Sequence, residues 1–528
     1  MKKTIVSISV SFLFCTAIAQ KDVSEKYAAH ITGDGLKKHL VIIAGEEMEG
    51  RETGTEGQRK AAAYIEAQYK AIGLQQVPAL KGYQQFFPLF EDSTDVTSGS
   101  LKIDNTDLTY GEHYYVNVMG NSTKTITANS FVFAGYGISE KNYDDYKGID
   151  VKGKVAVIFL GEPRKDGIYL VSGTNSYSKY TYPGASAKIK TATEKGAAAV
   201  IFINPSAPNI SSALTNANKK SKLYFPPSGD KEQVNYLVAS HSVLKTFFAE
   251  WNTDGLLQSA KAAAAFNPVE LPEKKTAFQF TFKKERLVVN ASNVIGVIEG
   301  TDKKEEYVFL TAHYDHLGKK GDKIYYGADD DGSGTCGVIA MAEAFAKAKA
   351  EGHGPRRTIV FMTVSGEEKG LWGSEYYTDN PVFPLDKTTV DLNIDMVGRV
   401  DTEREKADTL NYLYVVGHDK LSSELPVINE GVNKKYTGLT LDYKFDDPND
   451  RERIYYRSDH YNFARKGVPV LFFYDGMLKA DYHKPTDTVD KIYWDLYQKR
   501  MRLIFHTAWE MANRDAMLKR DIALPSEE

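Results

Sequence analysis

The feature that most restricts the fold is an alternation of buried strands and helices in the second half of the chain. Runs rich in β-branched, aliphatic and aromatic residues predict strands at residues 293–299, 307–312, 358–364, 391–397 and 468–474. Helical spacing of apolar residues predicts helices at residues 337–350 and 494–513. Strands that alternate with helices form a mostly parallel sheet with helices on both faces. We therefore predict an α/β fold built on a mixed, mostly parallel sheet.

A chain of 528 residues is too long for one ordinary domain, so two or three units are expected. Between residues 100 and 275 the pattern changes to short strands and turns with one or two helices, which predicts a separate β-rich unit. The helix predicted at residues 58–72, ended by Gly73, belongs to the segment before it. The predicted organisation is residues 1–19, 20–99, 100–275 and 276–528, of which the second and fourth segments form one domain.

The first 19 residues are predicted to be a signal peptide. Met1-Lys2-Lys3 is a short basic stretch, residues 5–17 are apolar, and Ala17-Ile18-Ala19 is a typical cleavage site. The protein is therefore expected to be secreted or periplasmic. No other run of 18 apolar residues occurs, so we expect no membrane span after removal of the signal. The net charge of −4 and the lack of a basic block argue against nucleic acid as a partner.

Candidate metal ligands follow the predicted strands, at the end of the sheet where active sites of α/β proteins lie. They are His313, the triplet Asp329–Asp331, the pair Glu367–Glu368, Asp395 and His483. Each has an ordinary alternative: a hydrogen-bonded loop histidine, solvated carboxylates, or an aspartate paired with a basic residue. Together, two imidazoles and several carboxylates predict a metal site, and no C-x-x-C or H-E-x-x-H motif competes. Asp315, two residues after His313, is expected to accept a hydrogen bond from that imidazole and fix its tautomer.

These segments resemble the co-catalytic zinc exopeptidases, a family that includes secreted bacterial aminopeptidases and glutamate carboxypeptidase. The motif Arg457-Ser458-Asp459-His460 and the segment from Gly50 to Thr55 also match that family. Gly135-Tyr136-Gly137 and the segment from Asp150 to Val155 resemble a protease-associated domain inserted into the catalytic domain. The resemblance implies the zinc exopeptidase fold with this β-rich insertion.

The resemblance also implies the role of each ligand. One zinc ion would take His313, Asp330 and Asp395, and the other would take Asp330, Glu368 and His483. Asp330 would bridge the two ions and precede a cis peptide bond. Each ion then keeps room for a water molecule, as a catalytic zinc ion requires. Cobalt or manganese could replace zinc in such a site.

By the same resemblance, a metal-bridged water is the nucleophile and Glu367 is the general base. The hydroxyl group of Tyr482 is implied to stabilise the tetrahedral intermediate. The implied reaction is removal of N-terminal amino acids from peptides or proteins.

Other functions stay open at this stage. A carboxypeptidase of the glutamate carboxypeptidase type would need a cation for the substrate carboxylate, and Arg451, Arg453 and Arg457 are candidates. A glutaminyl-cyclase-like enzyme would use one zinc ion, and a receptor-like relative would lack ligands, whereas this chain has the full set. A calcium site is disfavoured by the two imidazoles, because calcium prefers oxygen ligands.

Overall fold

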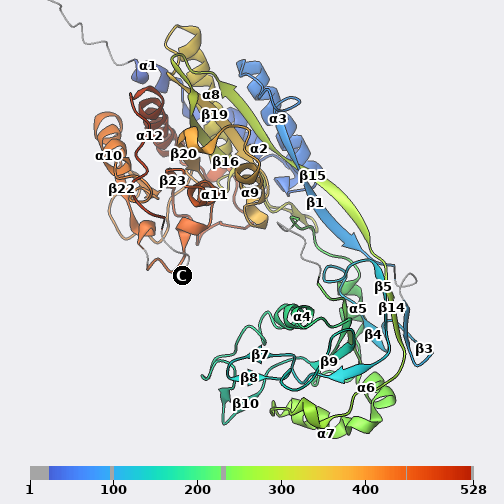
Figure 1. Ribbon diagram of the computed structural model, residues 1–528. Helices are drawn as coiled ribbons and strands as arrows, with labels where there is room; N and C mark the ends of the chain where they lie inside the picture. The colour runs from blue at the N-terminus through green and yellow to red at the C-terminus, as the bar shows by residue number, and fades with distance from the viewer. Residues whose placement is uncertain (1–22, 96–99, 227–232, 448, 525–528) are drawn as a thin grey trace, which may run out of the picture. The chain divides into compact units, whose positions relative to one another are not determined.

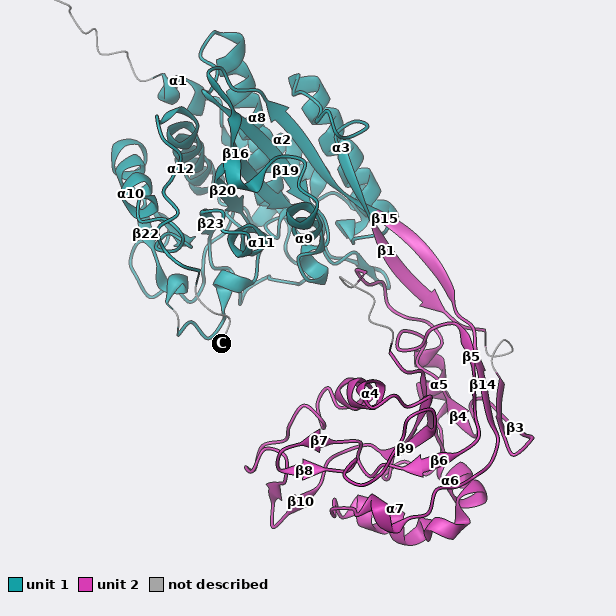
Figure 2. Ribbon diagram, in the orientation of Figure 1, with its two compact units in different colours: residues 1–87, 291–528 teal, residues 88–290 magenta. Residues whose placement is uncertain are grey.

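The computed structural model describes residues 23–95, 100–226, 233–447 and 449–524. The predicted signal peptide, residues 1–19, lies outside the described residues. The chain forms two compact units (Figure 2): unit 1 is Met1–Phe87 with Ala291–Glu528, and unit 2 is Pro88–Asn290. The predicted insertion at residues 100–275 lies within the bounds of unit 2.

Within the described residues, unit 1 is built on one eight-stranded mixed sheet (Figure 1). In spatial order its strands are β1 (Gln84–Ser93), β15 (Glu285–Ile298), β19 (Arg357–Val364), β16 (Lys303–His313), β20 (Thr388–Ile394), β23 (Val470–Tyr474), β21 (Tyr412–Val416) and β22 (Thr440–Asp442). The central strands β19, β16, β20 and β23 are parallel, whereas β15 and β21 pair antiparallel with their neighbours β19 and β23. The predicted mixed, mostly parallel sheet is confirmed.

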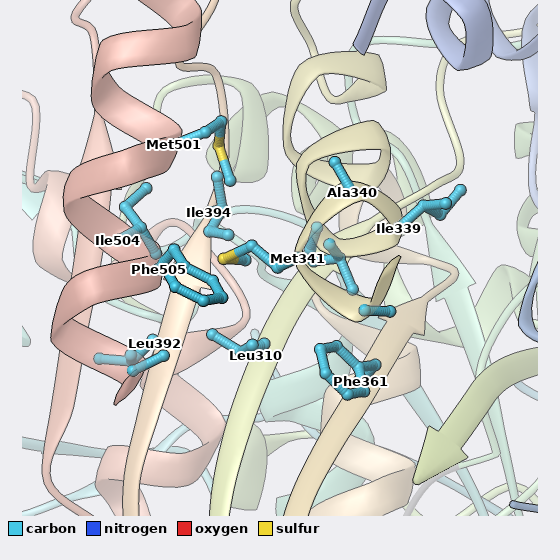
Figure 3. Packing of buried hydrophobic residues seen from close by; sticks show 14 of the residues in the cluster. Leu310, Ile339, Ala340, Met341, Phe361, Leu392, Ile394, Met501, Ile504 and Phe505 are labelled. Carbon is cyan, nitrogen blue, oxygen red and sulfur yellow. The ribbon is translucent and has the colours of Figure 1, made fainter. Parts of the chain in front are cut away.

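Helices cover both faces of this sheet. On one face lie α2 (Gly33–Ile43), α3 (Glu56–Ile72), α8 (Gly332–Ala350), α10 (Leu425–Tyr436) and α12 (Trp494–Asn513), and on the other α9 (Trp372–Asp379) and α11 (His460–Arg465). Side chains alternate between the two faces along each strand. Val308 and Leu310 of β16 therefore pack in one core, and Phe309 packs in the other. Figure 3 shows Met341 of α8 and Phe505 of α12 above the strand residue Leu310.

Helix α8 begins at Gly332, five residues before the predicted start at 337. The Asp331 carboxylate caps the helix by accepting a hydrogen bond from the Gly334 amide at 2.8 Å. The glycines of the first turn carry no apolar pattern, so the sequence could not mark this start. Helix α8 lies close to α12: a Cβ atom on Gly337 would lie 2.6 Å from Cε of Met501.

In its described residues, unit 2 has a five-stranded and a four-stranded sheet, besides two short strand pairs, β7 (Ser139–Glu140) with β8 (Tyr143–Asp144) and β10 (Arg164–Lys165) with β11 (Ile168–Tyr169). The first runs β4 (Tyr114–Tyr115), β13 (Tyr236–Ala239), β12 (Ala199–Ile203), β9 (Val155–Phe159) and β6 (Phe131–Phe133), and the second runs β3 (Thr106–Leu108), β2 (Ser100–Ile103), β14 (Phe278–Phe282) and β5 (Lys124–Ala128). Its helices are α4 (Ala185–Glu194), α5 (Ser212–Asn218), α6 (His241–Phe247) and α7 (Thr253–Lys261). The expected β-rich character is confirmed.

The chain passes between the units through two strands that are neighbours in the sheet. It leaves unit 1 along β1 and returns along β15, and both strands cross the unit boundary (Figure 2). In the described part of the chain, no helix is long and apolar enough to span a membrane.

His460, at the start of α11, makes the stability of the fold depend on pH. The ring is fully buried and stacks on Phe472 with centroids 4.7 Å apart. Burial lowers the pKa of His460 from 6.5 to about 3. Below pH 6.5 the unfolded chain therefore takes up a proton that the folded protein does not accept until about pH 3.

As the pH falls from 6.5 to 4.5, we expect the buried His460 imidazole to reduce the free energy of unfolding by about 2–3 kcal/mol, at 1.36 kcal/mol per pKa unit. The His460→Phe variant should lack this contribution. The measurement is urea unfolding of both proteins at pH 7 and 4.5 with a chelator present. An identical pH dependence in the two proteins would contradict the expectation.

Candidate metal centre

The predicted ligands come together at the carboxyl ends of the central strands. His313 is the last residue of β16, and Glu367 and Glu368 lie in a 3-10 helix (Glu367–Lys369) directly after β19. Asp395 was predicted inside a strand, but β20 ends at Ile394, so its side chain lies just beyond the sheet. Asp330 precedes α8, and His483 lies in the loop after β23.

Two half-sites share Asp330. In the His313 half-site, Nε2 of His313 lies 3.3 Å from Oδ1 of Asp330 and 3.5 Å from Oδ1 of Asp395. In the His483 half-site, Nε2 of His483 lies 3.3 Å from Oδ2 of Asp330 and 3.0 Å from Oε2 of Glu368. The two oxygens of Asp330 therefore face different histidines, which is the arrangement that a bridging carboxylate needs.

These side chains fit a pair of zinc-like ions. Among the described residues, Nε2 of His313, Oδ2 of Asp330 and Oε1 of Glu368 are buried with no hydrogen-bond partner, which is rare in folded proteins. Tetrahedral ligands at bond lengths of about 2.0–2.2 Å lie about 3.3–3.5 Å apart, as three of the four separations do. The mixture of imidazole and carboxylate donors suits zinc.

Three groups of described residues could hold a metal ion. Two belong to this centre: His313 with Glu367 and Asp395, and His316 with Asp330 and Glu368. The third joins His418, Asp419 and Asp446. In that group the Lys420 ammonium already pairs with Asp446 at 3.0 Å and with Asp419 at 2.7 Å, so it is an ordinary ion-paired cluster.

Glu367 lies beside the His313 half-site. Its Oε2 is 3.8 Å from Nε2 of His313, and its side chain is 13% exposed. Burial raises the pKa of the Glu367 carboxyl well above its usual range, and the nearby Asp395 and Glu368 carboxylates add to the shift, while His313 opposes it. A carboxyl group in this environment can both accept and return a proton.

Asp315 contacts His313 differently from the expected contact. Nδ1 of His313 lies 3.1 Å from the Asp315 carbonyl oxygen but 3.6 Å from its carboxylate. The carboxylate instead accepts hydrogen bonds from the Thr53 hydroxyl at 2.6 Å and the Glu367 amide at 3.3 Å. Asp315 therefore orients the imidazole through its backbone and the Glu367 segment through its side chain.

Tyr482 lies in the same pocket. Its ring stacks on His483 with centroids 3.8 Å apart, and its hydroxyl oxygen accepts a hydrogen bond from Nη2 of Arg457 at 3.3 Å. Burial raises the pKa of Tyr482 well above its usual range. The phenol therefore stays protonated and keeps its hydrogen as a donor.

The pocket is narrow and opens to solvent. It is lined by Asp330, Glu367, Asp395, Met396, Ile454, Arg457, Phe472, Tyr474, Leu478 and Tyr482. Of the three arginines considered above, Arg457 lines the pocket, whereas Arg451 and Arg453 are not among its lining residues.

Asp487 and His316 are parts of the centre that the sequence patterns did not single out. The buried Asp487 carboxylate accepts hydrogen bonds from the backbone amides of Asp329 and Asp330 at 3.0–3.1 Å, and so connects the loop of His483 to the loop of Asp330. The Asp330–Asp331 peptide bond is cis, as the resemblance implied. Nδ1 of His316 lies 2.7 Å from Oε1 of Glu368.

Arg51 is hydrogen-bonded to the loops that carry His313 and Asp330. Its buried guanidinium donates to four carbonyl oxygens: Tyr314 at 2.6 Å, Ile43 at 2.9 Å, Tyr326 at 2.6 Å and Gly327 at 2.9 Å. Arg51, the last residue of the 3-10 helix Glu46–Arg51, therefore connects the His313 loop with the Asp330 loop.

The Arg51→Met variant should lower the free energy of unfolding by about 3–4 kcal/mol, because several buried carbonyl groups lose their donor. The matched control is Arg59→Met, since Arg59 lies exposed on α3, where it forms a surface ion pair with Glu56 and a 3.4 Å hydrogen bond to the Gly54 carbonyl oxygen. Urea unfolding with a chelator present measures both variants. Equal losses in the two variants would contradict the assigned role of Arg51.

Comparison with known proteins finds peptidases among the relatives of this chain. A probable zinc metalloprotease from Pyrenophora tritici-repentis is 31% identical over 170 residues, covering 31% of this chain and 34% of the relative. Aminopeptidase YwaD from Bacillus subtilis is 27% identical over 234 residues, covering 43% and 46%. A probable glutamate carboxypeptidase from Arabidopsis thaliana is 35% identical over 112 residues, covering 21% and 15%. The chain thus spans less than half the length of each of these relatives.

Two family profiles match the chain. Residues 116–231, within unit 2, match the PA domain, and residues 293–508, which contain every predicted metal ligand, match Peptidase family M28. The resemblance inferred from the motifs is confirmed. Residues 293–508 are thus similar to peptidase family M28, and residues 116–231 are similar to the PA domain.

Proposed function

We propose that this protein is a dizinc aminopeptidase that is exported from the cell and removes N-terminal residues from peptides or proteins. The observation that carries the proposal is the position of Asp330 between two half-sites, with Glu367 in the same pocket. The match of residues 293–508 to Peptidase family M28 and the names of the relatives, a probable zinc metalloprotease and an aminopeptidase, support it. The signal-peptide pattern of residues 1–19 supports export.

Zinc ions bound in the two half-sites would polarise the scissile carbonyl group and lower the pKa of the attacking water. His313, Asp395, Glu368 and His483 would hold these ions, with Asp330 shared between them. The charge of the ions would also lower the pKa of Glu367, opposing the effect of burial.

Glu367 would move the proton. Its carboxylate oxygen accepts a proton from the attacking water and later returns it to the nitrogen of the leaving amine. The position of Oε2, 3.8 Å from Nε2 of His313, places this oxygen beside the reacting centre. The Glu367 amide bond to Asp315 fixes the segment that carries it.

Tyr482 would bind the substrate carbonyl oxygen. Its hydroxyl group accepts a hydrogen bond from Arg457, so its own hydrogen is available to donate into the pocket. A donor aimed at the developing negative charge stabilises the transition state more than the ground state. Arg457 holds the phenol in that orientation.

The charge of the pocket favours an aminopeptidase over a carboxypeptidase. Asp330, Glu367 and Asp395 line the pocket with Arg457 as the one cation among its lining residues. Such a site attracts the ammonium group of a free N-terminus more strongly than a C-terminal carboxylate. The carboxypeptidase alternative draws on Arg457 and on the glutamate carboxypeptidase relative.

A panel of substrates tests the proposal. We expect cleavage of aminoacyl-naphthylamides and of peptides with a blocked C-terminus, no cleavage of peptides with a blocked N-terminus, and loss of activity with a chelator that zinc restores. Cleavage of N-blocked peptides with a free C-terminus would overturn the aminopeptidase assignment. Activity that resists the chelator would overturn the metal-dependent mechanism.

A further inference from the structure

The segment of residues 366–371, which carries Glu367, has an unusual backbone conformation. Three of its residues have positive φ angles: 87° at Gly366, 115° at Gly370 and 62° at Leu371. Glycine adopts such angles freely, whereas they are unfavourable for leucine because of its Cβ atom. Contacts from outside the segment must therefore hold Leu371 in this conformation.

Helix α11 supplies such a contact through the side chain of Asn462. Nδ2 of Asn462 donates hydrogen bonds to the Leu371 carbonyl oxygen at 3.1 Å and to Oγ of Ser374 at 2.8 Å. Oδ1 of Asn462 accepts a hydrogen bond from Nη1 of Arg465 at 3.3 Å. Because the nitrogen and the oxygen of the amide have different partners, the side chain is held in one orientation, with Nδ2 toward Leu371.

Ser374 and Asp459 extend this contact into a buried network. Oγ of Ser374 accepts the hydrogen bond from Asn462 and donates its own hydrogen to Oδ1 of Asp459 at 2.5 Å. Oγ also lies 3.1 Å from the Leu371 carbonyl oxygen, but its single hydrogen serves the shorter bond. Ser374, Asp459 and Asn462 are between 0% and 4% exposed. Loss of one bond would leave buried polar atoms unpaired, so the network supports Leu371 rigidly.

Leu371 connects this network to Glu367. The backbone amides of Gly370 and Leu371 donate to the Glu367 carbonyl oxygen at 2.9 Å and 3.0 Å. The other backbone contact of Glu367, from its amide to the Asp315 carboxylate, is longer at 3.3 Å. The position of Glu367 therefore depends on the position of Leu371. A displacement of a catalytic group by about 1 Å can lower a rate by about 10²-fold.

We propose that Asn462 is a positioning residue for the general base. By holding the Leu371 carbonyl group, it keeps the Glu367 carboxylate beside the reacting centre. The inference rests on the role of Glu367 in the function proposed above. Asn462 is not among the residues that line the pocket. It therefore acts through Glu367, and its loss should change kcat rather than the binding of substrate.

Removal of the Asn462 amide tests the inference in the full protein. The variant is Asn462→Leu, which keeps a similar side-chain shape and loses both hydrogen bonds. Ser374→Ala is a milder variant, because it leaves the bond from Asn462 to Leu371 intact. The matched control is Asn433→Leu. Asn433 is 5% exposed, and its Nδ2 donates to the Leu439 carbonyl oxygen at 2.8 Å in the loop after α10.

We expect Asn462→Leu to lower kcat by about 10²-fold and to keep KM within about threefold, with two zinc ions bound at saturating zinc. Ser374→Ala should lower kcat by about 3–10-fold, the equivalent of one hydrogen bond. Asn433→Leu should lower the free energy of unfolding in urea but retain the wild-type kcat. A wild-type kcat in Asn462→Leu or in Ser374→Ala would overturn the inference. A fall in kcat that is matched by loss of zinc would place the support on Glu368 and overturn it as well.

A double variant separates positioning of the base from a general structural role. Glu367→Gln has no base to position, so the addition of Asn462→Leu should lower kcat further by less than about threefold. If the two single effects multiply instead, Asn462 does not act through Glu367 and the inference is wrong. Failure of the base itself is a separate result: normal hydrolysis by Glu367→Gln alone contradicts the proposed function whatever the Asn462 variants do.

Discussion

Replacing Asp330 with alanine should remove both metal ions at once. Its two carboxylate oxygens each lie 3.3 Å from a different histidine, so both half-sites lose a ligand. The ions supply several kcal/mol of transition-state stabilisation, so we expect kcat/KM to fall by about 10³-fold or more, at 1.36 kcal/mol per factor of ten. Elemental analysis of the purified variant should find no tightly bound zinc.

Two comparisons make this result specific. Asp395→Ala removes a ligand from the His313 half-site alone and should leave one equivalent of zinc bound. Asp386→Ala, at an exposed position away from the centre, should leave both ions and the activity in place. If Asp330→Ala retains a full tight equivalent, Asp330 does not bridge the two half-sites.

Replacing Glu367 with glutamine should separate proton transfer from metal binding. Glutamine keeps the shape of the side chain but cannot accept the proton of the attacking water. Because general base catalysis contributes about 10²–10⁴-fold, kcat should fall by that factor while two zinc ions stay bound. The measurements are steady-state kinetics on an aminoacyl-naphthylamide and elemental analysis of the same preparation.

The matched control is Glu375→Gln, which makes the same chemical change on the half-buried face of α9. It should retain wild-type kinetics. Normal hydrolysis by Glu367→Gln would show that another group takes the proton. Loss of one zinc ion in that variant would instead identify Glu367 as a metal ligand. Its side chain lies close enough to His313 and Asp395 for the three to hold one ion.

The fold was largely readable from the sequence where elements are long and apolar. Strands β16, β19 and β23 and helix α12 appear within a few residues of their predicted bounds, because burial on both faces of a parallel sheet leaves an unbroken apolar run. Strands β21 and β22 and helix α10 were not predicted. Their patterns are short or half-polar, and only packing at the edge of the sheet selects their conformation.

The candidate ligands could be predicted because each follows its own strand, and the ends of parallel strands meet in space. His316, Asp487 and Arg51 could not be predicted in the same way. Each is a single polar residue outside the long apolar elements, and its role depends on contacts with segments far away in the sequence. The contact between Asp487 and the Asp330 amide, for example, joins residues 157 positions apart.

The passage of the chain along β1 and β15 has a consequence for how such a protein can change. These strands are neighbours in the sheet of unit 1, so the two ends of residues 88–290 leave from adjacent positions. An inserted segment whose two ends are close together costs little loop-closure entropy, and this entropic cost grows only slowly with the length of the segment. The sheet of unit 1 therefore requires only that the chain come back along the next strand. A segment inserted between those strands can therefore be lengthened, exchanged or lost while the residues of the candidate metal centre keep their places.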